Sequence, residues 1–246
     1  MQTIEIHGPP LAPPVDYARW TLDRLGIPYK MVPSAAVISA IRSYRNNVPI
    51  EPPLILAEGR AHGGFRNTLA FLSEVQNTDA SSLSLTPNPA LVELLFKQLF
   101  GQAVRCFYRK MLTAPETLVP MSTQGVPAWN RWVVRYAYPV WARVLGRGLR
   151  LQEMSSEKDL ADIEIAFNRI EEMLGDRVFL AGDVPGADDV FFATVASPII
   201  LPGSHPVAMP DLSALPAPFR SQVQAFRDTT AGQLAFRTYA ARTDAR

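Results

Sequence analysis

A glycine pair followed by an arginine is the part of this sequence best suited to bind an anion. Residues 57–72 read AEGRAHGGFRNTLAFL, and we expect a helix to begin directly after Gly63 and Gly64. Glycines at this place leave the first N–H groups of the helix open, and these groups favour a carboxylate or a phosphate. Gly64, Phe65 and Arg66 are therefore candidate ligand-binding residues. The alternative is that Arg66 is a solvated surface charge and Phe65 packs into a subunit interface.

The composition excludes several other kinds of site. The chain has 246 residues, a net charge of +1, one cysteine and three histidines. A single cysteine, Cys106, forms no internal disulfide, redox pair or cysteine-based zinc site, and three scattered histidines do not suggest a metal site. The balanced charge gives no reason to expect a nucleic-acid partner. We see no signal peptide and no apolar run of the roughly 20 residues that a membrane span needs, so we expect a cytoplasmic protein without a membrane partner.

Alternating strands and helices are expected over residues 1–76. A first strand, TIEIH, leads through the proline-rich GPPLAPP into a helix that ends at Gly26, a residue type typical of helix C-termini. A second strand and a short helix capped by Ser34 follow. Two strands joined by a tight turn then lead into a helix over 64–75. This order predicts an α/β domain.

The remainder of the chain reads as helical. Residues 77–87 form a polar linker rich in turn-forming residues, and a helical domain is expected over 88–246. Amphipathic helices are expected at 88–112, at 127–149 with a kink at Pro139, at 156–174, from about 187, and at 214–228.

Five aromatic residues gather on the helix expected at 127–149. They are Trp129, Trp132, Tyr136, Tyr138 and Trp141. Such a set more often belongs to a core or an interface than to a cofactor site, so we expect these side chains to pack against protein.

Three segments, in this order and spacing, resemble the glutathione transferase superfamily over essentially the whole chain. IHGPPLAPPVDYARWTLDRLGIPY is similar to its first strand, active-site turn and first helix, and EPPLILAEGRAHGGFRNTLAFL to its proline, two-strand and third-helix block. DRVFLAGDVPGADDVFFA is similar to a segment in which an acid, here Asp189, binds backbone N–H groups at a helix start capped by Gly186. The resemblance implies a thioredoxin-like domain, an all-helical bundle domain, a homodimer and glutathione as the bound cofactor.

The sequence departs from this family at the places that would hold glutathione. Ala12 stands where the resemblance implies a serine or cysteine that activates the thiol. Pro53 and Leu54 match the family's cis-proline and the strand after it, but the preceding Pro52 has no N–H to offer a ligand. Gly64-Phe65 stands where the family has an acid and a serine that hold the γ-glutamyl group. These departures argue against conjugation of glutathione by the family's usual route.

The resemblance also places four further candidates. Asp16 and Tyr17 follow the active-site turn and are the candidate catalytic residues, while Arg105 and Tyr108 lie at i and i+3 on the helix that would line an interdomain cleft. Cys106 is more typical of an inert core. The leading interpretation is a glutathione transferase-like protein that binds glutathione or another small anionic ligand. Two alternatives stay open: a non-catalytic binding or scaffold protein on the same fold, and an isomerase or lyase that needs no thiol activator.

Overall fold

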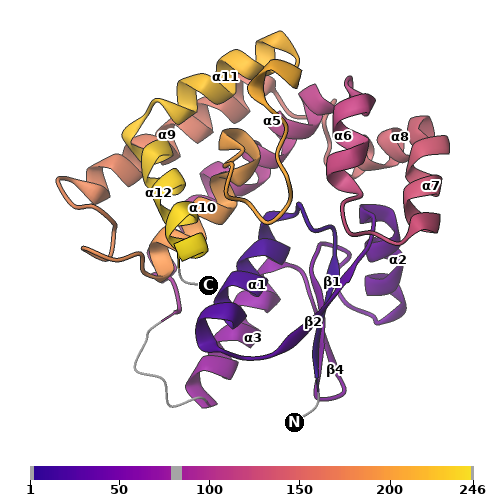
Figure 1. Ribbon diagram of the computed structural model, residues 1–246, viewed down its shortest axis with the longest axis horizontal. Helices are drawn as coiled ribbons and strands as arrows, with labels where there is room; N and C mark the ends of the chain where they lie inside the picture. Colours follow the sequence, from indigo (N-terminus) through magenta and orange to yellow (C-terminus); the bar gives the residue numbers. More distant parts are fainter. Residues whose placement is uncertain (1–2, 79–84, 245–246) are drawn as a thin grey trace. The chain divides into compact units, whose positions relative to one another are not determined.

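The computed structural model describes residues 3–78 and 85–244, and the chain divides into two compact units (Figure 1). The first unit combines residues 1–86 with 119–145, and the second combines 87–118 with 146–246. A small mixed sheet with helices on its faces, as in a thioredoxin-like domain, forms the first unit, and the second is helical. The fold class expected from the sequence is confirmed. The division into domains at 1–76 and 88–246 stays a prediction.

Four strands form the sheet of the first unit, in the order β2-β1-β3-β4. They are β1 (Ile4–Gly8), β2 (Tyr29–Pro33), β3 (Leu54–Ala57) and β4 (Arg60–Gly63). Strand β1 runs parallel to β2 and antiparallel to β3, and Ile6 lies opposite Met31 and Ile55. Helices α1 (Pro13–Leu25) and α3 (Phe65–Thr78) pack together on one face, and α2 (Ala36–Arg45) lies on the other (Figure 1).

The ends of α1 follow the sequence pattern. Pro13 and Pro14 occupy its first turn, where a missing N–H breaks no helical bond. Gly26 ends the helix with φ of +66°, and its N–H donates to the carbonyl of Asp23 at 3.2 Å. Val15, Ala18 and Leu22 are buried, as their helical spacing predicts.

The expected cap of α2 is wrong. The cap residue is Ala35, which makes no side-chain bond, and α2 begins two residues after Ser34. The cause is the preceding strand: the N–H of Ser34 donates to the carbonyl of Gly8 at 3.1 Å, which holds Ser34 to the end of the sheet. Its hydroxyl is buried and has no hydrogen-bond partner in the part of the chain that the structure describes.

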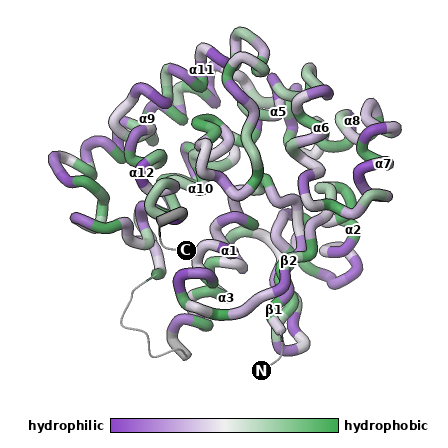
Figure 2. The backbone as a smooth tube through the Cα atoms, in the orientation of Figure 1, coloured by the Kyte–Doolittle hydropathy of each residue, from purple (hydrophilic) through white to green (hydrophobic). Residues whose placement is uncertain are grey.

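Helices build the second unit. They are α4 (Pro89–Leu95), the π-helical η1 (Phe96–Phe100), α5 (Gly101–Met111), α9 (Ser156–Leu174), α10 (Ala187–Ile200), the 3-10 turn η2 (Leu212–Ala214), α11 (Ala217–Arg227) and α12 (Thr230–Asp244). The helix expected over 88–112 therefore contains a π-helical stretch, and α12 was not anticipated. Hydrophilic and hydrophobic residues alternate along α9 and α11, as Figure 2 shows, so each buries one face.

Helix α10 is the centre of the second unit. Every residue from Asp189 to Ile200 is buried, and the helix packs against α5, α11 and α12. The carboxylate of Asp189 accepts from the N–H groups of Leu180 at 2.7 Å, Gly186 at 2.9 Å and Ala181 at 3.3 Å. Asp189 thus satisfies the helix start and ties the preceding loop to it, which confirms its structural role.

Three further helices follow α5. They are α6 (Pro115–Ser122), α7 (Ala128–Tyr136) and α8 (Tyr138–Gly148). The single kinked helix expected over 127–149 is two helices, separated at Ala137, whose ψ is +22°. Because the break precedes Pro139 by two residues, the proline falls in the first turn of α8, where its ring obstructs no hydrogen bond.

Candidate functional site

The loop before α3 is closed by its own hydrogen bonds. The Pro52–Pro53 peptide bond is cis, as expected from the sequence. The N–H of Gly64 donates to the carbonyls of Glu51 at 3.0 Å and Pro53 at 3.1 Å. Gly64 has φ of +84°, which favours glycine, and a side chain at Gly63 would come within 2.5 Å of the neighbouring loop. The glycines are thus explained by packing, and the expectation of an open amide is wrong for Gly64.

The candidate catalytic residues lie in the interior of the first unit. Asp16 and Tyr17 are 0% and 1% exposed, and the Tyr17 hydroxyl donates to the carbonyl of Leu85 at 3.5 Å. The Tyr17 ring packs on Phe65, with ring centroids 5.7 Å apart. Tyr17, predicted to be catalytic, and Phe65, predicted to contact a ligand, therefore pack against each other in the core. Ala12 is the N-cap residue of α1 and makes no side-chain hydrogen bond. Its methyl group cannot donate a hydrogen bond to a thiol.

Of the ligand contacts predicted in the first unit, one is exposed. Pro53, Leu54, Gly64 and Phe65 are buried, whereas Arg66, in the first turn of α3, is exposed. Leu54 lies in β3, opposite Gly63 of β4. A cation at the start of α3 is what remains of the binding pattern that the sequence suggested.

Arg105 is held by an acid of its own unit. Its Nε donates to both carboxylate oxygens of Asp159, at 3.1 and 3.0 Å, and its Nη2 donates to the same carboxylate. Arg109 donates to Asp159 as well, at 3.2 Å. Asp159 is 1% exposed. The guanidinium of Arg105 is therefore committed to a buried ionic cluster, in which Asp159 pairs with two arginines.

The side chains of Tyr108 and Cys106, on the same helix as Arg105, stay protonated at neutral pH. Burial raises the pKa of Tyr108 to about 12, so its phenol stays protonated. Burial, with a smaller effect of the nearby Asp159 carboxylate, raises the pKa of Cys106 to about 11. A thiol that stays protonated is a poor nucleophile, so the prediction of an inert Cys106 gains support.

A charged cluster on β1 was not singled out from the sequence. His7 Nε2 lies 3.0 Å from Glu5 Oε2, and Arg42 Nη1 lies 3.2 Å from His7 Nδ1. Because an arginine only donates, Nδ1 must accept, and the proton of the neutral ring sits on Nε2 and is donated to Glu5. Lys30 donates to the same carboxylate at 2.8 Å. The spacing of Glu5 and His7 at i and i+2 could have indicated that both lie on one face of the strand.

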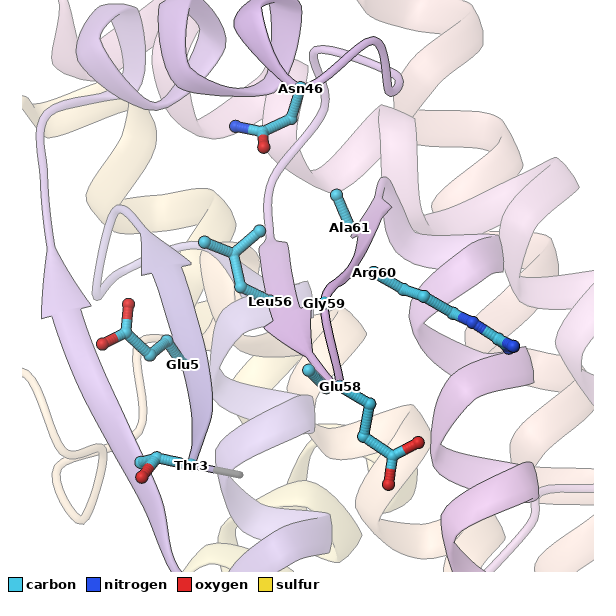
Figure 3. A pocket seen from close by; sticks show the side chains of 9 residues that line it. Thr3, Glu5, Asn46, Leu56, Glu58, Gly59, Arg60 and Ala61 are labelled. Carbon is cyan, nitrogen blue, oxygen red and sulfur yellow. The ribbon is translucent and has the colours of Figure 1, made fainter. Parts of the chain in front are cut away.

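Beside this cluster a hollow lies over one face of the sheet, where Glu5, Leu56 and Ala61 are in register on neighbouring strands (Figure 3). The hollow measures about 390 Å³, and Glu5, Asn46, Leu56 and the β3–β4 turn contribute to its lining. In Figure 3 the side chains of Glu58 and Arg60 extend outward from that turn. The hollow therefore offers few converging polar groups, and it lacks the predicted site residues.

Metal and membrane-spanning features are absent from residues 3–78 and 85–244. Within these ranges no group of three or more His, Cys, Asp or Glu side chains could hold a metal ion. No helix there is long and apolar enough to cross a membrane.

Solved structures of known proteins provide the comparison that decides the fold. Residues covering 98% of this chain superpose on 98% of the glutathione transferase GSTFuA3 from Phanerochaete chrysosporium, with a TM-score of 0.60 and 12% identity. The chain has the glutathione transferase fold. A second glutathione transferase, CsGST63524 of Ceriporiopsis subvermispora in complex with glutathione, matches with a TM-score of 0.54 and 14% identity over 99% of this chain and 97% of its own.

The glutathione transferase fold extends over essentially the whole chain, but sequence similarity is low. Glutathione S-transferase III in its apo form matches with a TM-score of 0.52 and 15% identity over 98% of this chain and 96% of its own. No family model and no curated protein matches the sequence. At this identity the likeness shows the fold alone, and function has to be argued from the residues.

Proposed function

We propose that this chain is a glutathione transferase-like protein that binds a small anionic ligand and does not activate a glutathione thiol. The observation that carries the proposal is the state of the two groups nearest the expected thiol position. Ala12 has no hydroxyl, and Tyr17 is 1% exposed with its phenol donated to a backbone carbonyl. A thiol of pKa about 8.5 needs a hydrogen-bond donor or a positive neighbour to ionise at neutral pH.

The proposed anchor for the ligand is Arg66. It is the exposed cation in the first turn of α3, and an anion there is also favoured by the positive end of the helix dipole. The family's acid–serine pair cannot be restored simply at this place. Gly64 has a left-handed backbone and Phe65 fills the core, so the loop is built for a different set of contacts.

A titration and a conjugation assay test two claims: that Arg66 binds an anionic ligand, and that the protein does not activate the thiol of glutathione. Glutathione is titrated calorimetrically, up to millimolar concentration, into the wild type, the Arg66→Ala variant and the control Arg60→Ala, which removes another exposed arginine of the same unit. We expect weak binding that is lost in Arg66→Ala and kept in Arg60→Ala, with no enzyme-dependent conjugation of glutathione to an electrophile. Conjugation at enzyme-like rates would refute the loss of thiol activation.

A second candidate function is a non-catalytic scaffold with no small ligand. It is favoured by the packing of Tyr17 against Phe65, because that contact turns two candidate site residues into core. Absence of heat and of any rise in melting temperature with glutathione, phosphate and small carboxylates would select this candidate. A homodimer and a cytoplasmic location are also proposals, and light scattering of the purified protein tests the first of them.

A further inference from the structure

Helix α7 faces solvent with its aromatic side. Its exposed residues, here called the aromatic stripe, recur at i, i+3, i+4 and i+7, and they are Trp129, Trp132, Val133 and Tyr136, with exposed fractions of 55%, 63%, 41% and 65%. The opposite side of the helix buries Asn130 and Val134, each 1% exposed. Of the aromatic set for which the sequence indicated a core or an interface, Trp141 is buried, whereas Trp129, Trp132 and Tyr136 do not belong to the core of the chain. A helix that buries an asparagine and exposes two tryptophans is oriented against the usual rule.

Helix α8 also exposes apolar side chains. Val140 and Val144 are 57% and 48% exposed and lie one helical turn apart. The rings of Trp132 and Tyr136 pack on each other with centroids 4.6 Å apart, which keeps them together as one surface. The aromatic stripe on α7 is an exposed apolar patch, and a patch of large exposed apolar side chains marks an interaction site in soluble proteins.

The charge around the stripe has one sign. Residues 117–152 contain no Asp, Glu or Lys and five arginines, whereas the whole chain has a net charge of +1. Arg131, Arg135 and Arg143 are exposed, and no carboxylate of the described residues forms an ion pair with them. At about 100° per residue, Arg135 lies about 60° from Trp132 and so borders the aromatic stripe on α7, and Arg143 lies about 60° from Val140 on α8. Arg131 lies further round α7.

The positive charge around the aromatic stripe argues against a second copy of the chain as the partner that covers it. In a two-fold contact the same surface meets itself, so Arg135 and Arg143 would meet a surface that carries arginines and no acid to compensate them. The occupant should instead be anionic and should accept exposed tryptophan and tyrosine rings. Anionic phospholipid headgroups meet both requirements, because Trp and Tyr prefer the membrane–water interface and arginine pairs with phosphate.

We propose that α7 and the first half of α8 dock this protein on anionic membrane surfaces, with the aromatic stripe inserted among the headgroups. This goes beyond ligand binding at α3, and it departs from the expectation of no membrane partner, which rested on the lack of a spanning segment. The arginines supply the attraction to the charged leaflet and the rings supply the interfacial burial. Docking is peripheral, since no helix of residues 3–78 and 85–244 could span a bilayer.

The test uses the full chain and two kinds of vesicle. Sedimentation with phosphatidylcholine vesicles is compared with sedimentation with vesicles that contain about 30% phosphatidylserine. The variants are W129A/W132A and R135E/R143E. The matched control, Y44A/I165A, removes two large apolar side chains that are 76% and 50% exposed elsewhere. Circular dichroism and melting temperature establish that each variant is folded.

We expect wild type and control to bind the anionic vesicles, to bind neutral vesicles at least about tenfold less, and to lose binding at high salt. Both stripe variants should lose about tenfold or more in binding. Vesicles should shift the tryptophan emission of the wild type to the blue, and should not shift that of W129A/W132A, which keeps only the buried Trp20 and Trp141.

Three results would overturn the proposal. The first is equal binding of wild type and W129A/W132A to anionic vesicles. The second is a wild-type dimer that becomes monomeric in W129A/W132A while neither binds vesicles, because the stripe would then be covered by a second copy. The third is capture by an acidic peptide, such as polyglutamate, without vesicle binding, because the occupant would then be an acidic protein.

Discussion

Replacing Asp159 by asparagine should destabilise the second unit strongly. The carboxylate is 1% exposed and accepts from two arginines, Arg105 and Arg109, whose side chains are 15% and 18% exposed. Asparagine keeps the size of the side chain but leaves two positive charges without a counter-charge. Removing one partner of a buried ion pair costs about 3–5 kcal/mol, and the residual exposure of the arginines favours the lower end, about 3 kcal/mol. That is a large part of the 5–15 kcal/mol typical of a folded protein.

The positions of the tryptophans allow the effect to be assigned to a unit. All four, Trp20, Trp129, Trp132 and Trp141, belong to the first unit, so fluorescence reports on it, whereas far-UV circular dichroism reports on helices of both. In urea, a loss of about 3 kcal/mol at an m-value of about 1–3 kcal/mol/M lowers the midpoint by about 1–3 M. We expect this shift in the dichroism of D159N. The exposed Glu164 lies on the same helix, and E164Q should stay within about 0.5 kcal/mol of the wild type.

A further variant separates lost charge balance from lost packing. Replacing Asp159 by leucine and both arginines by methionine removes every charge of the cluster, so most of the stability lost in D159N should return. A D159N variant that loses less than about 1 kcal/mol, or no more than E164Q, would refute the reasoning from the buried ion pair. A triple variant as unstable as D159N would show that shape, and not uncompensated charge, causes the loss.

Three other predictions concern single side chains. Phe65→Ala should cost about 3–5 kcal/mol because the ring is 1% exposed and packs on Tyr17; a loss below about 1 kcal/mol in fluorescence-detected urea unfolding would contradict this packing. Burial lowers the pKa of His7 below its ordinary 6.5, so its contribution to stability is present above pH 6.5 and is lost as the pH falls from there toward the lowered pKa. The slope of unfolding free energy against pH should flatten in His7→Gln, and nitrogen NMR of the wild type should show the proton on Nε2. Cys106, with a pKa of about 11, should resist a disulfide reagent at pH 8 in the native protein and react once urea is added, so rapid native labelling would contradict its burial.

Local signals in the sequence were sufficient for much of the fold. Gly26 ends α1 in a left-handed conformation, Asp189 binds the N–H groups at the start of α10, and the Pro52–Pro53 bond is cis, each as expected. These features depend on residues close together in the chain. Where a longer-range contact intervened, the local signal failed: Ser34 has a good capping side chain, but its N–H bonds to the carbonyl of Gly8 in the sheet.

The roles of the candidate residues were less predictable, because they depend on which side of a helix faces solvent and on partners far away in the chain. Helical spacing groups Trp129 with Trp132, but the same spacing is compatible with a buried or an exposed stripe, and the stripe is exposed. Arg105 could be placed on a helix face, while its partner Asp159 lies 54 residues further along the chain. Tyr17 follows the proline turn as a catalytic residue would, yet its phenol points to Leu85, beyond the reach of any local pattern.

The burial of α10 on all sides has a consequence for how the protein is made. Its most extensive neighbour, α12, is synthesised 30 residues after α10 ends at Ile200, and α11 lies between them in the chain. A helix that is apolar all round has no face suited to water until its neighbours are in place. During translation α10 should therefore remain a chaperone target until α12 has left the ribosome, whereas the first unit can assemble once residue 145 has emerged. The timing of α12 synthesis, as well as the packing of the core, therefore bears on how efficiently the second unit folds.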